Sequence, residues 1–349
     1  MSIKLAVLFG GQSHEHPVSL MSVTSVLNNL DKKYDIYMVG ITASGCWYHY
    51  SGPVSDIENG DWEKHPDNTE IILSTNPEHH GFYEIENNKY VYVHVILPIL
   101  HGRNGEDGTI QGLCQLANIP CVSCDLTSSA MAMDKEFTHL IAESYGVPMA
   151  KYVALHRRDY HNPDELYDRL VKMLGLPFYV KPSKEGSSFG AHKISNHEDF
   201  VKGFDDAFKY DDKILAEEFI SGTEVGCGIM GDDTVGEVFE IVVETEMYGY
   251  AEKYDGYKTN IYVPTKNLSK EQEEEVKRLS KVVYKALGCD VLGRADFFAS
   301  DRIIFNEINL IPGFTSHSLY PASFKGAGMD YTTLLNNLID IALKRGTNE

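Results

Sequence analysis

The sequence predicts an α/β fold built from three units in series. At 349 residues the chain is too long for one ordinary hydrophobic core. The chain opens with a strand, helix and strand pattern, and helices and strands continue to alternate toward the C-terminus. No internal repeat or low-complexity tract interrupts the alternation. We therefore expect an N-terminal unit with an open parallel sheet, followed by two further α/β units.

The N-terminal unit begins with a βαβ pattern. Lys4–Phe9 is an apolar run typical of a buried strand, and Pro17 suits the first position of a helix that ends near Leu30. Tyr34–Ile41 is the second strand, so the two strands are expected to be parallel. Residues 51–90 are polar and turn-rich and are expected to elaborate the same unit. The other elements expected here are strands at 71–73, 90–97 and 120–122 and a helix at 109–117.

The clearest helix signal lies in the last third of the chain. Ser269 and Gln272 form a capping box, and Gly288 is placed to end the helix. The apolar residues of its buried face are Val276, Leu279, Val283 and Leu287. Between the N-terminal unit and this last third we expect helices at 136–145, 163–174 and 197–209 and strands at 152–155, 178–180 and 213–219.

Composition excludes several classes of protein. The formal net charge of −20 argues against general binding of nucleic acid, which relies on basic residues. No apolar stretch approaches the roughly 20 residues that span a bilayer, and no secretory signal is recognisable. We expect a cytoplasmic protein with no membrane partner. Cys121 and Cys124 form a CxxC without a second pair at zinc-finger spacing, so ordinary thiols are expected.

Acidic and amide side chains cluster in LGRADFFASDRIIFNEINL, residues 292–310, which predicts two strands joined by a tight turn. A turn centred on Ser300 and Asp301 places position 296 opposite 305 and position 294 opposite 307. Side chains alternate between the faces of a strand. The residues expected on one shared face are Arg294, Asp296 and Phe298 from the first strand and Ile303, Phe305, Glu307 and Asn309 from the second.

This face is a candidate metal site. Asp296, Glu307 and Asn309 offer oxygen ligands without His or Cys, which suits Mg²⁺ or Mn²⁺. Mg²⁺ usually takes one or two protein carboxylates and completes its shell with water and phosphates. The alternative is a solvated strand face paired by salt bridges. The neighbouring apolar residues favour the metal site.

Two glycine-containing loops are candidates for binding an anion. KPSKEGSSFG, residues 181–190, follows a strand and offers small hydroxyl residues and backbone N–H groups. Neither a Walker A motif nor GxGxxG occurs, so a flexible surface loop is the alternative. Gly10 and Gly11 form a strand-to-helix turn of the kind in which backbone passes close to a ligand.

Motifs spread along the chain form an ordered series. They are GGQSHEHPVSLMS at 10–22, HGRNGEDGTIQG at 101–112, MDK at 133–135, VKPSKEGSSFG at 180–190, EEFISGTE at 217–224, EKY at 252–254, GRADFF at 293–298 and NEINLIPGFTSHSLYP at 306–321. In this order they resemble the D-alanine–D-alanine ligases of the ATP-grasp superfamily, which include related D-alanine–D-serine ligases. The resemblance covers essentially the whole chain.

The resemblance implies a three-domain ATP-grasp architecture and assigns roles to residues. The expected domains are an N-terminal α/β substrate domain (1–128), a central ATP-grasp domain (129–216) and a C-terminal ATP-grasp domain with the metal site (217–349). ATP would lie between the last two. The implied nucleotide residues are Lys135, Lys181 and Lys253 at the phosphates and Glu217, Phe219, Ile220 and Glu224 at adenine and ribose. Two Mg²⁺ or Mn²⁺ ions would bind at Asp296, Glu307 and Asn309.

The resemblance also implies the chemistry. One D-alanine carboxylate attacks the γ-phosphate of ATP, and the amine of a second D-alanine displaces phosphate from the acyl phosphate. The product serves peptidoglycan precursor synthesis, and a homodimer is expected. Glu15, Ser187 and Tyr254 would form a hydrogen-bonded group over the active site, with Glu15 on the first ammonium. The groups placed near the substrates and the oxyanion are His101, Arg294, Gly313, Ser318 and Leu319.

Some positions depart from the family's usual pattern. Leu310 follows the metal-binding Asn where a small hydroxyl residue is usual, and Pro17 is less usual two residues after Glu15. Leu319 and Tyr254 favour D-alanine as second substrate, since relatives that use D-serine or D-lactate often differ there. A small pocket discriminates weakly against one hydroxyl, so a D-alanine–D-serine ligase is the alternative.

Overall fold

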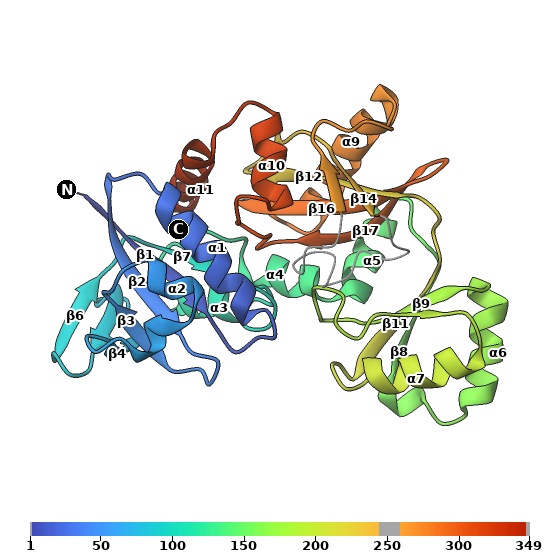
Figure 1. Ribbon diagram of the computed structural model, residues 1–349, viewed down its shortest axis with the longest axis horizontal. Coiled ribbons are helices and arrows are strands. Elements are labelled where there is room, and N and C mark those ends of the chain that lie inside the picture. Colours follow the sequence, from blue (N-terminus) through green and yellow to red (C-terminus); the bar gives the residue numbers. More distant parts are fainter. Residues whose placement is uncertain (1, 244–258, 347–349) are drawn as a thin grey trace.

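The computed structural model describes residues 2–243 and 259–346, in three sheets that follow one another along the chain (Figure 1). The N-terminal sheet and the central sheet lie at opposite ends, and the C-terminal sheet lies beside both. The α/β prediction is confirmed. Among the described helices none is both long and apolar enough to cross a bilayer. The expected loop residues Lys253 and Tyr254 lie outside the described residues.

The N-terminal sheet has seven strands in the order β6-β5-β4-β3-β2-β1-β7. The predicted βαβ unit is confirmed, because β1 runs parallel to both β2 and β7. The polar segment after β2 adds antiparallel strands to the same sheet. The strand expected at 90–97 is two strands, and the one expected at 120–122 is a single bridge from Cys121 to Ile96. The elements are β1 Ile3–Gly10, α1 His16–Asn29, β2 Tyr34–Ile41, β3 Trp47–Tyr50, α2 Ser55–Glu58, η1 Asp61–Lys64, β4 Thr69–Leu73, β5 Gly81–Glu84, β6 Lys89–Tyr92, β7 Val95–Ile99 and α3 Thr109–Leu116.

The central sheet has the order β10-β9-β11-β8 and is antiparallel throughout. Two helices cover it, α6 with Pro163 in its first turn and α7 capped by Asn196. Both helices begin where predicted. The elements are β8 Tyr152–His156, η2 Arg157–Asp159, α6 Pro163–Leu174, β9 Phe178–Pro182, β10 His192–Ile194, α7 His197–Ala207 and β11 Lys213–Glu218.

The C-terminal sheet has the order β15-β14-β12-β16-β17, with β13 paired to β12. The predicted capping box is present in α9, where Ser269 accepts from the Gln272 amide and Gln272 accepts from the Ser269 amide. The four predicted core residues of this helix are at most 1% exposed. The elements are β12 Thr223–Met230, β13 Thr234–Val235, β14 Phe239–Val243, β15 Thr259–Tyr262, α9 Lys270–Ala286, β16 Leu292–Ala299, β17 Ile303–Asn309, α10 Leu319–Gly326 and α11 Tyr331–Gly346.

Each of the three sheets, with the helices packed on it, is called a body below. Helices α4 Leu126–Met133 and α5 Lys135–Ser144 link the N-terminal body to the central body along the chain. Ala132 and Ala142 from these helices belong to the core of the C-terminal sheet, together with α9 residues. Helix α11 returns to the N-terminal sheet, where Leu338 packs in one core with Val7 of β1. The domain limits at 128 and 216 stay a prediction. Helix α5 thus packs on the C-terminal sheet although it precedes the central sheet in the sequence, and α11 packs on the N-terminal sheet although it follows the C-terminal sheet.

All six cysteines are free, Cys46 exposed and the other five buried. Cys124, of the CxxC, donates its thiol to the Leu292 carbonyl at 3.2 Å. The prediction of ordinary thiols is confirmed.

The register of the β16–β17 hairpin differs from the prediction. Asp296 pairs with Glu307 and Arg294 pairs with Asn309, two residues further along β17 than the count from the turn predicted. The turn holds three residues, 300–302, which accounts for one position. A β-bulge accounts for the other, because Asp296 pairs with 307 while Phe297 pairs with 305.

The bulge changes which β17 side chains share a face. Ile303 and Phe305 were predicted to lie beside Glu307 but instead belong to the core, where Phe305 packs edge-on against Phe297 at 5.5 Å. Ile308 belongs to the same core, so the core spacing along β17 is two residues and then three. The extra residue lets β17 turn its polar half toward the site while its apolar half stays buried.

The turn after β1 owes its glycines to the neighbouring strand. Gly10 and Gly11 have φ of +88° and +97°, and a Cβ on Gly10 would lie 2.1 Å from the Ile41 carbonyl oxygen of β2. The Gly11 amide donates to the same carbonyl at 2.8 Å. Close approach of backbone to backbone therefore explains Gly10, and the predicted approach to a ligand is not its reason.

We expect Gly10→Ala to destabilise the protein more than Gly60→Ala. Both glycines have positive φ, but the space around a Cβ on Gly60 is open within 4 Å. Gly60→Ala should therefore lower the unfolding free energy by only about 1–2 kcal/mol, which is the cost of placing an alanine in the left-handed backbone conformation. Gly10→Ala adds the clash with Ile41. Urea denaturation measures both values, and equal losses would contradict the steric explanation.

Candidate active site

Two adjoining cavities occupy the junction of the three bodies. One has a volume of about 720 Å³ and is lined by the loop before α1, the loop after β7 and the segment after β17. The other, about 510 Å³, lies between β9 and β11 of the central sheet and β12, β14 and β17 of the C-terminal sheet. The cavities are continuous in their lining, since the residues common to both are Lys135, Glu185, Gly186, Ser187, Glu224 and Glu307.

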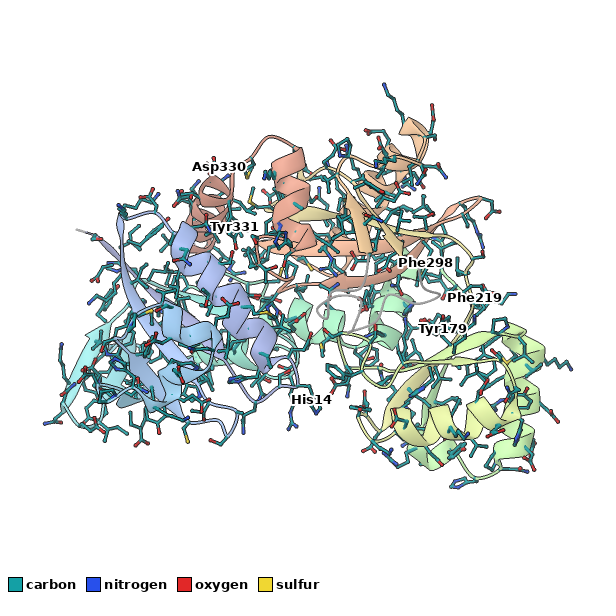
Figure 2. All side chains as sticks on the ribbon, viewed as in Figure 1. His14, Tyr179, Phe219, Phe298, Asp330 and Tyr331 are labelled. Carbon is teal, nitrogen blue, oxygen red and sulfur yellow. The ribbon has the colours of Figure 1, made fainter. Side chains whose placement is uncertain are left out.

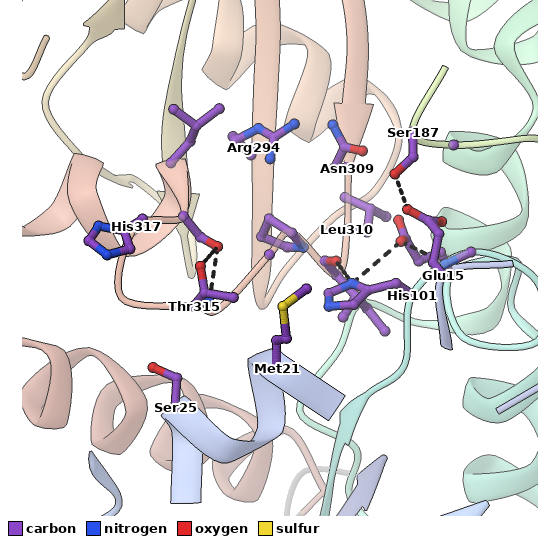
Figure 3. Close-up of a pocket in the computed structure, with 18 of the residues that line it drawn as sticks. Glu15, Met21, Ser25, His101, Ser187, Arg294, Asn309, Leu310, Thr315 and His317 are labelled. Atoms are coloured by element: carbon purple, nitrogen blue, oxygen red, sulfur yellow. Dashed lines mark hydrogen bonds and ion pairs between the residues drawn. The ribbon is translucent and has the colours of Figure 1, made fainter. Parts of the chain in front are cut away.

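Glu15 and Ser187 meet at the edge of the larger cavity (Figure 3). The Ser187 hydroxyl donates to Glu15 Oε1, which joins the loop before α1 to the loop after β9. Glu15 is 8% exposed, and Ser187 has a φ of +48°. A Cβ on Gly102 would lie 2.6 Å from Glu15 Oε2, so this carboxylate is tightly enclosed by backbone. Two of the three residues predicted to form a hydrogen-bonded group are thus in contact.

His101 and Glu106, from the loop after β7, line the same cavity as Glu15. His101 is 4% exposed, with Nδ1 3.0 Å from the Ile311 carbonyl and Nε2 3.0 Å from the Ser22 hydroxyl. Burial lowers the pKa of His101, so the ring is neutral at pH 7. Glu106 Oε1 accepts from the Gly102 amide at 3.0 Å. Burial, with Glu15 nearby, raises the pKa of Glu106 to about 8.

Arg294 is the cation of the strand face. Its Nη2 lies 2.6 Å from Asp296 Oδ2 and its Nε 2.9 Å from Oδ1, a bidentate pair at 2% exposure of Asp296. Burial opposes the charge of Arg294, but Asp296 more than compensates and raises its pKa above the ordinary value. Asn309 Nδ2 lies 3.1 Å from Asp296 Oδ2. The predicted convergence of Asp296, Glu307 and Asn309 beside Arg294 is present despite the changed register.

Two lysines face the carboxylates between the cavities. Lys135, at the start of α5, donates to the Glu185 carbonyl at 2.7 Å and lies 3.8 Å from Glu307 Oε2. Burial and the positive charge of Lys181 lower the pKa of Lys135. Lys181, on β9, lies 2.6 Å from Glu217 Oε2. The two described lysines of the three predicted therefore line the smaller cavity, each beside one carboxylate.

Glu217 has one oxygen that lacks a donor within the described chain. His139 Nε2 lies 3.1 Å from Oε1, but Nδ1 of that ring is 2.6 Å from the Lys135 carbonyl and must carry the proton of a neutral imidazole. Burial lowers the pKa of His139 to about 4, with Lys181 and Lys135 adding to the effect, so the ring is neutral at pH 7. The buried Glu217 Oε1 is left to accept from a ligand.

Aromatic side chains line the smaller cavity near this oxygen. Tyr179 comes from β9, Phe219 directly follows β11, and Phe298 comes from β16; Figure 2 shows all three where the central and C-terminal sheets face each other. The rings of Tyr179 and Phe219 are 6.0 Å apart. Ile220 and Glu224 line the same cavity. This combination of flat apolar surface and one free acceptor suits a planar ring with an amino group.

The segment after β17 closes the far side of the larger cavity. Gly313 packs close to Ser318, since a Cβ on Gly313 would lie 2.8 Å from Ser318 Oγ. The Ser318 hydroxyl accepts from the Thr315 amide at 2.9 Å. Leu319 is buried against Phe239 and Ile241 of β14. The predicted substrate residues His101, Gly313, Ser318 and Leu319 all line this cavity.

Sequence reasoning missed several lining residues. Glu106 belongs to the quoted HGRNGEDGTIQG motif and Glu185 to VKPSKEGSSFG, so the motifs contained a signal for both. Thr315 and His317 line the larger cavity from within the last quoted motif. Met21 and Ser25 of α1 line it opposite them (Figure 3). Met21 belongs to the quoted GGQSHEHPVSLMS motif, whereas Ser25 had no signal beyond the helix itself.

The donor set suits a hard divalent cation. Asp296, Glu307 and Asn309 supply two carboxylates and an amide oxygen once the Asn309 amide is turned, which fits ions that complete their shell with phosphate and water. No cluster of three or more His, Cys, Asp or Glu side chains suited to a metal occurs within residues 2–243 and 259–346. The protein ligands present therefore fit an ion bound together with a phosphate better than a fully protein-bound one.

Comparison with known proteins identifies the relatives of this chain. Residues 4–124 match the family described as D-ala D-ala ligase N-terminus, and residues 141–340 match D-ala D-ala ligase C-terminus. The chain is 40% identical to a D-alanine–D-alanine ligase of Ruminiclostridium cellulolyticum, over 98% of this chain and 96% of that protein. It is 39% identical to a D-alanine–D-alanine ligase of Clostridium acetobutylicum, over 99% of both.

Solved structures give the same result. The VanG D-Ala:D-Ser ligase of Enterococcus faecalis superposes with a TM-score of 0.89 at 39% identity, over 98% of this chain and 100% of that chain. The D-alanine–D-alanine ligase of Coxiella burnetii superposes with a TM-score of 0.88 at 27% identity, over 99% of this chain and 95% of that chain. The chain therefore belongs to the D-alanine–D-alanine ligase family, whose members are ATP-dependent ligases.

Proposed function

We propose that this protein joins two D-alanines into D-alanyl-D-alanine with cleavage of ATP to ADP and phosphate, for peptidoglycan precursors. One observation carries the proposal. Residues that the resemblance assigned to nucleotide line one cavity, residues assigned to amino acids line the other, and Glu307 and Ser187 line both. A phosphoryl group at this boundary would lie within reach of both ligands.

In the first step a D-alanine carboxylate oxygen bonds to the γ-phosphorus and the bond to ADP breaks. Lys135 and Lys181 hold the phosphates by charge. The free oxygen of Glu217 and the rings of Tyr179 and Phe219 bind adenine, with Ile220 beside them. Glu224 is assigned to the ribose. Lys253, which lies outside the described residues, is also assigned to the phosphates.

In the second step the amine of a second D-alanine bonds to the acyl carbon, loses a proton, and phosphate leaves. Arg294 and a backbone N–H near Gly313 stabilise the tetrahedral oxyanion. Glu15 binds the first ammonium, with neutral His101 below it. Ser187 and Tyr254 are assigned to the path by which the amine loses its proton. Ser318 and Leu319 are assigned to the second amino acid.

Two Mg²⁺ or Mn²⁺ ions are proposed at Asp296, Glu307 and Asn309. When bound, they offset the negative charge that develops on the transferred phosphoryl group. Arg294 then shares Asp296 with the metal site, which keeps the guanidinium directed toward the same face.

The second candidate is a D-alanine–D-serine ligase, because VanG, a D-Ala:D-Ser ligase, is 39% identical to this chain. Leu319 favours D-alanine, since its side chain is apolar and buried against Phe239 and Ile241. The domain limits, a cytoplasmic location and a homodimer through the N-terminal domain are proposed from the same resemblance. Exposed Leu116 of α3 and Leu126 of α4, at 67% and 42%, support a surface for self-association.

We expect the purified protein to form D-alanyl-D-alanine and release phosphate when given ATP, Mg²⁺ and D-alanine. In competition with D-serine and D-lactate, D-alanine should dominate the products identified by mass. An uncharged amine is the nucleophile, so use of amino acids should rise with pH relative to D-lactate. Turnover only with D-serine as second substrate would replace the leading proposal by the second candidate.

We expect Glu307→Ala to lower kcat by roughly 10³-fold, because several kcal/mol of charge stabilisation are lost with a metal ligand. Circular dichroism should be unchanged. The matched control is Asp301→Ala, an exposed carboxylate in the turn of the same hairpin, which should keep full activity. Unchanged turnover of Glu307→Ala would contradict the metal-site assignment.

We expect Glu106→Gln to remove a pH dependence of stability. The pKa of Glu106 is raised from 4.5 to about 8, so its stabilising effect is complete below about pH 4.5 and is lost as pH rises through 8. Urea denaturation at pH 5, 7 and 9 should therefore show the variant gaining stability relative to the parent as pH rises. The gain should reach about 1.4 kcal/mol for each pH step of one between the two pKa values. Parallel profiles would contradict this, and exposed Glu86→Gln is the control.

A further inference from the structure

A lysine outside the assigned site is buried at the start of β11. Lys213 is 6% exposed, and its ammonium lies 2.7 Å from Asp134 Oδ1 and 2.8 Å from Glu136 Oε2. The same ammonium lies 4.3 Å from the centre of the Phe137 ring. Burial opposes its charge, but hydrogen bonds to Asp134 and Glu136 raise the pKa of Lys213 above the ordinary value. Desolvating a cation costs free energy even when it has partners, so a buried ion cluster is weak evidence of added stability.

All three partners of Lys213 belong to the start of α5. Asp134 is the N-cap of this helix, and its carboxylate accepts from the Phe137 amide. Glu136 and Phe137 lie in the first turn. The Lys213 ammonium therefore contacts three residues at the N-terminus of α5. Lys135, the phosphate-facing lysine, lies in this same turn.

Backbone contacts join the same groups. The Lys135 amide donates to the Ser183 carbonyl at 3.0 Å, and the Ser183 amide donates to the Lys213 carbonyl at 2.9 Å. The Ser183 hydroxyl donates to Asp134 Oδ1 at 2.9 Å. Lys213, Ser183 and Lys135 thus form a continuous path from β11, through the end of β9, to α5.

This path connects two bodies. β9 and β11 belong to the central sheet, whereas Ala142 of α5 is packed in the core of the C-terminal sheet. The smaller cavity lies between these two sheets. A change in how α5 meets β11 would therefore move Lys135 relative to Lys181 and Glu217.

We infer that Lys213 is a positioning residue for nucleotide binding: it fixes the start of α5 to the central sheet and so holds Lys135 at the phosphate position. This rests on the proposed function, in which Lys135 contacts ATP. Lys213 lines neither cavity, so its effect on ATP is indirect. The ion cluster thereby sets the distance between the two sheets that enclose the nucleotide.

The test is equilibrium binding of ATP with Mg²⁺, without amino acid, to Lys213→Met. Met keeps the length and removes the charge. We expect at least tenfold weaker binding, and in steady state a raised KM for ATP with the KM for D-alanine within twofold of the parent. Unchanged ATP binding would overturn the inference.

A second variant separates positioning from stability. Lys213→Met combined with Asp134→Asn and Glu136→Gln leaves no unpaired charge, and Asn keeps the N-cap. The urea midpoint of this variant should recover toward the parent, while ATP binding stays at least severalfold weaker. Recovery of ATP binding together with the midpoint would assign Lys213 a purely structural role and overturn the inference.

Two controls complete the experiment. Arg345→Met breaks the pair with Asp290, in which Nη1 and Oδ1 are 2.9 Å apart. Neither residue lines either cavity, so this variant should lower stability while leaving ATP binding within twofold. Lys202→Met breaks the exposed pair with Glu198 and should change neither. A parent protein that fails to bind ATP would instead reject the proposed function itself.

Discussion

One extra residue in β17, a β-bulge, determines which side chains of this strand lie beside Arg294 and Asp296. Because the bulge lies between the pairs 296–307 and 297–305, Phe305 packs against Phe297 in the core and only borders the smaller cavity, while Glu307 lines both cavities. A regular hairpin would keep both residues on one face and would require either a buried glutamate in the core or an exposed phenylalanine in the site. The bulge removes this conflict, and the bidentate Arg294–Asp296 pair lies directly beside it.

Within residues 2–243 and 259–346, each basic side chain assigned to the site is paired with a carboxylate. Lys181 lies beside Glu217, Lys135 near Glu307, and Arg294 on Asp296. The pairing keeps buried charges compensated in a chain whose net charge is −20. On the proposed function, divalent ions at Glu307 and Asp296 and a nucleobase at Glu217 would take over these carboxylates. The positive charge of the lysines and Arg294 would then act on phosphate, so ligand and metal binding reinforce each other.

The sequence allowed prediction of elements and motifs more fully than of the pairings between them. The capping box at Ser269 and the strand Tyr34–Ile41 depend on local chemistry and were found at their predicted places. The bulge, by contrast, depends on where Phe305 can be buried, which the local pattern does not contain. Helix α4 was missed because its eight residues, LTSSAMAM, carry little polar contrast between faces. The role of Lys213 is equally hidden, since its partners lie far away in the sequence and meet it only in the folded chain.

The loop before α1 shows how local backbone demands leave a side chain available for function. Gly10 is required by the Ile41 carbonyl, not by a phosphate. Glu15 is the N-cap residue of α1, yet its carboxylate makes no capping bond. Pro17 has no amide hydrogen and the His16 amide already donates to the Ser13 carbonyl, so the first turn needs fewer acceptors. The carboxylate is therefore available to Ser187 and the cavity, at a helix N-terminus that favours its negative charge. Pro17 is thus compatible with the role proposed for Glu15.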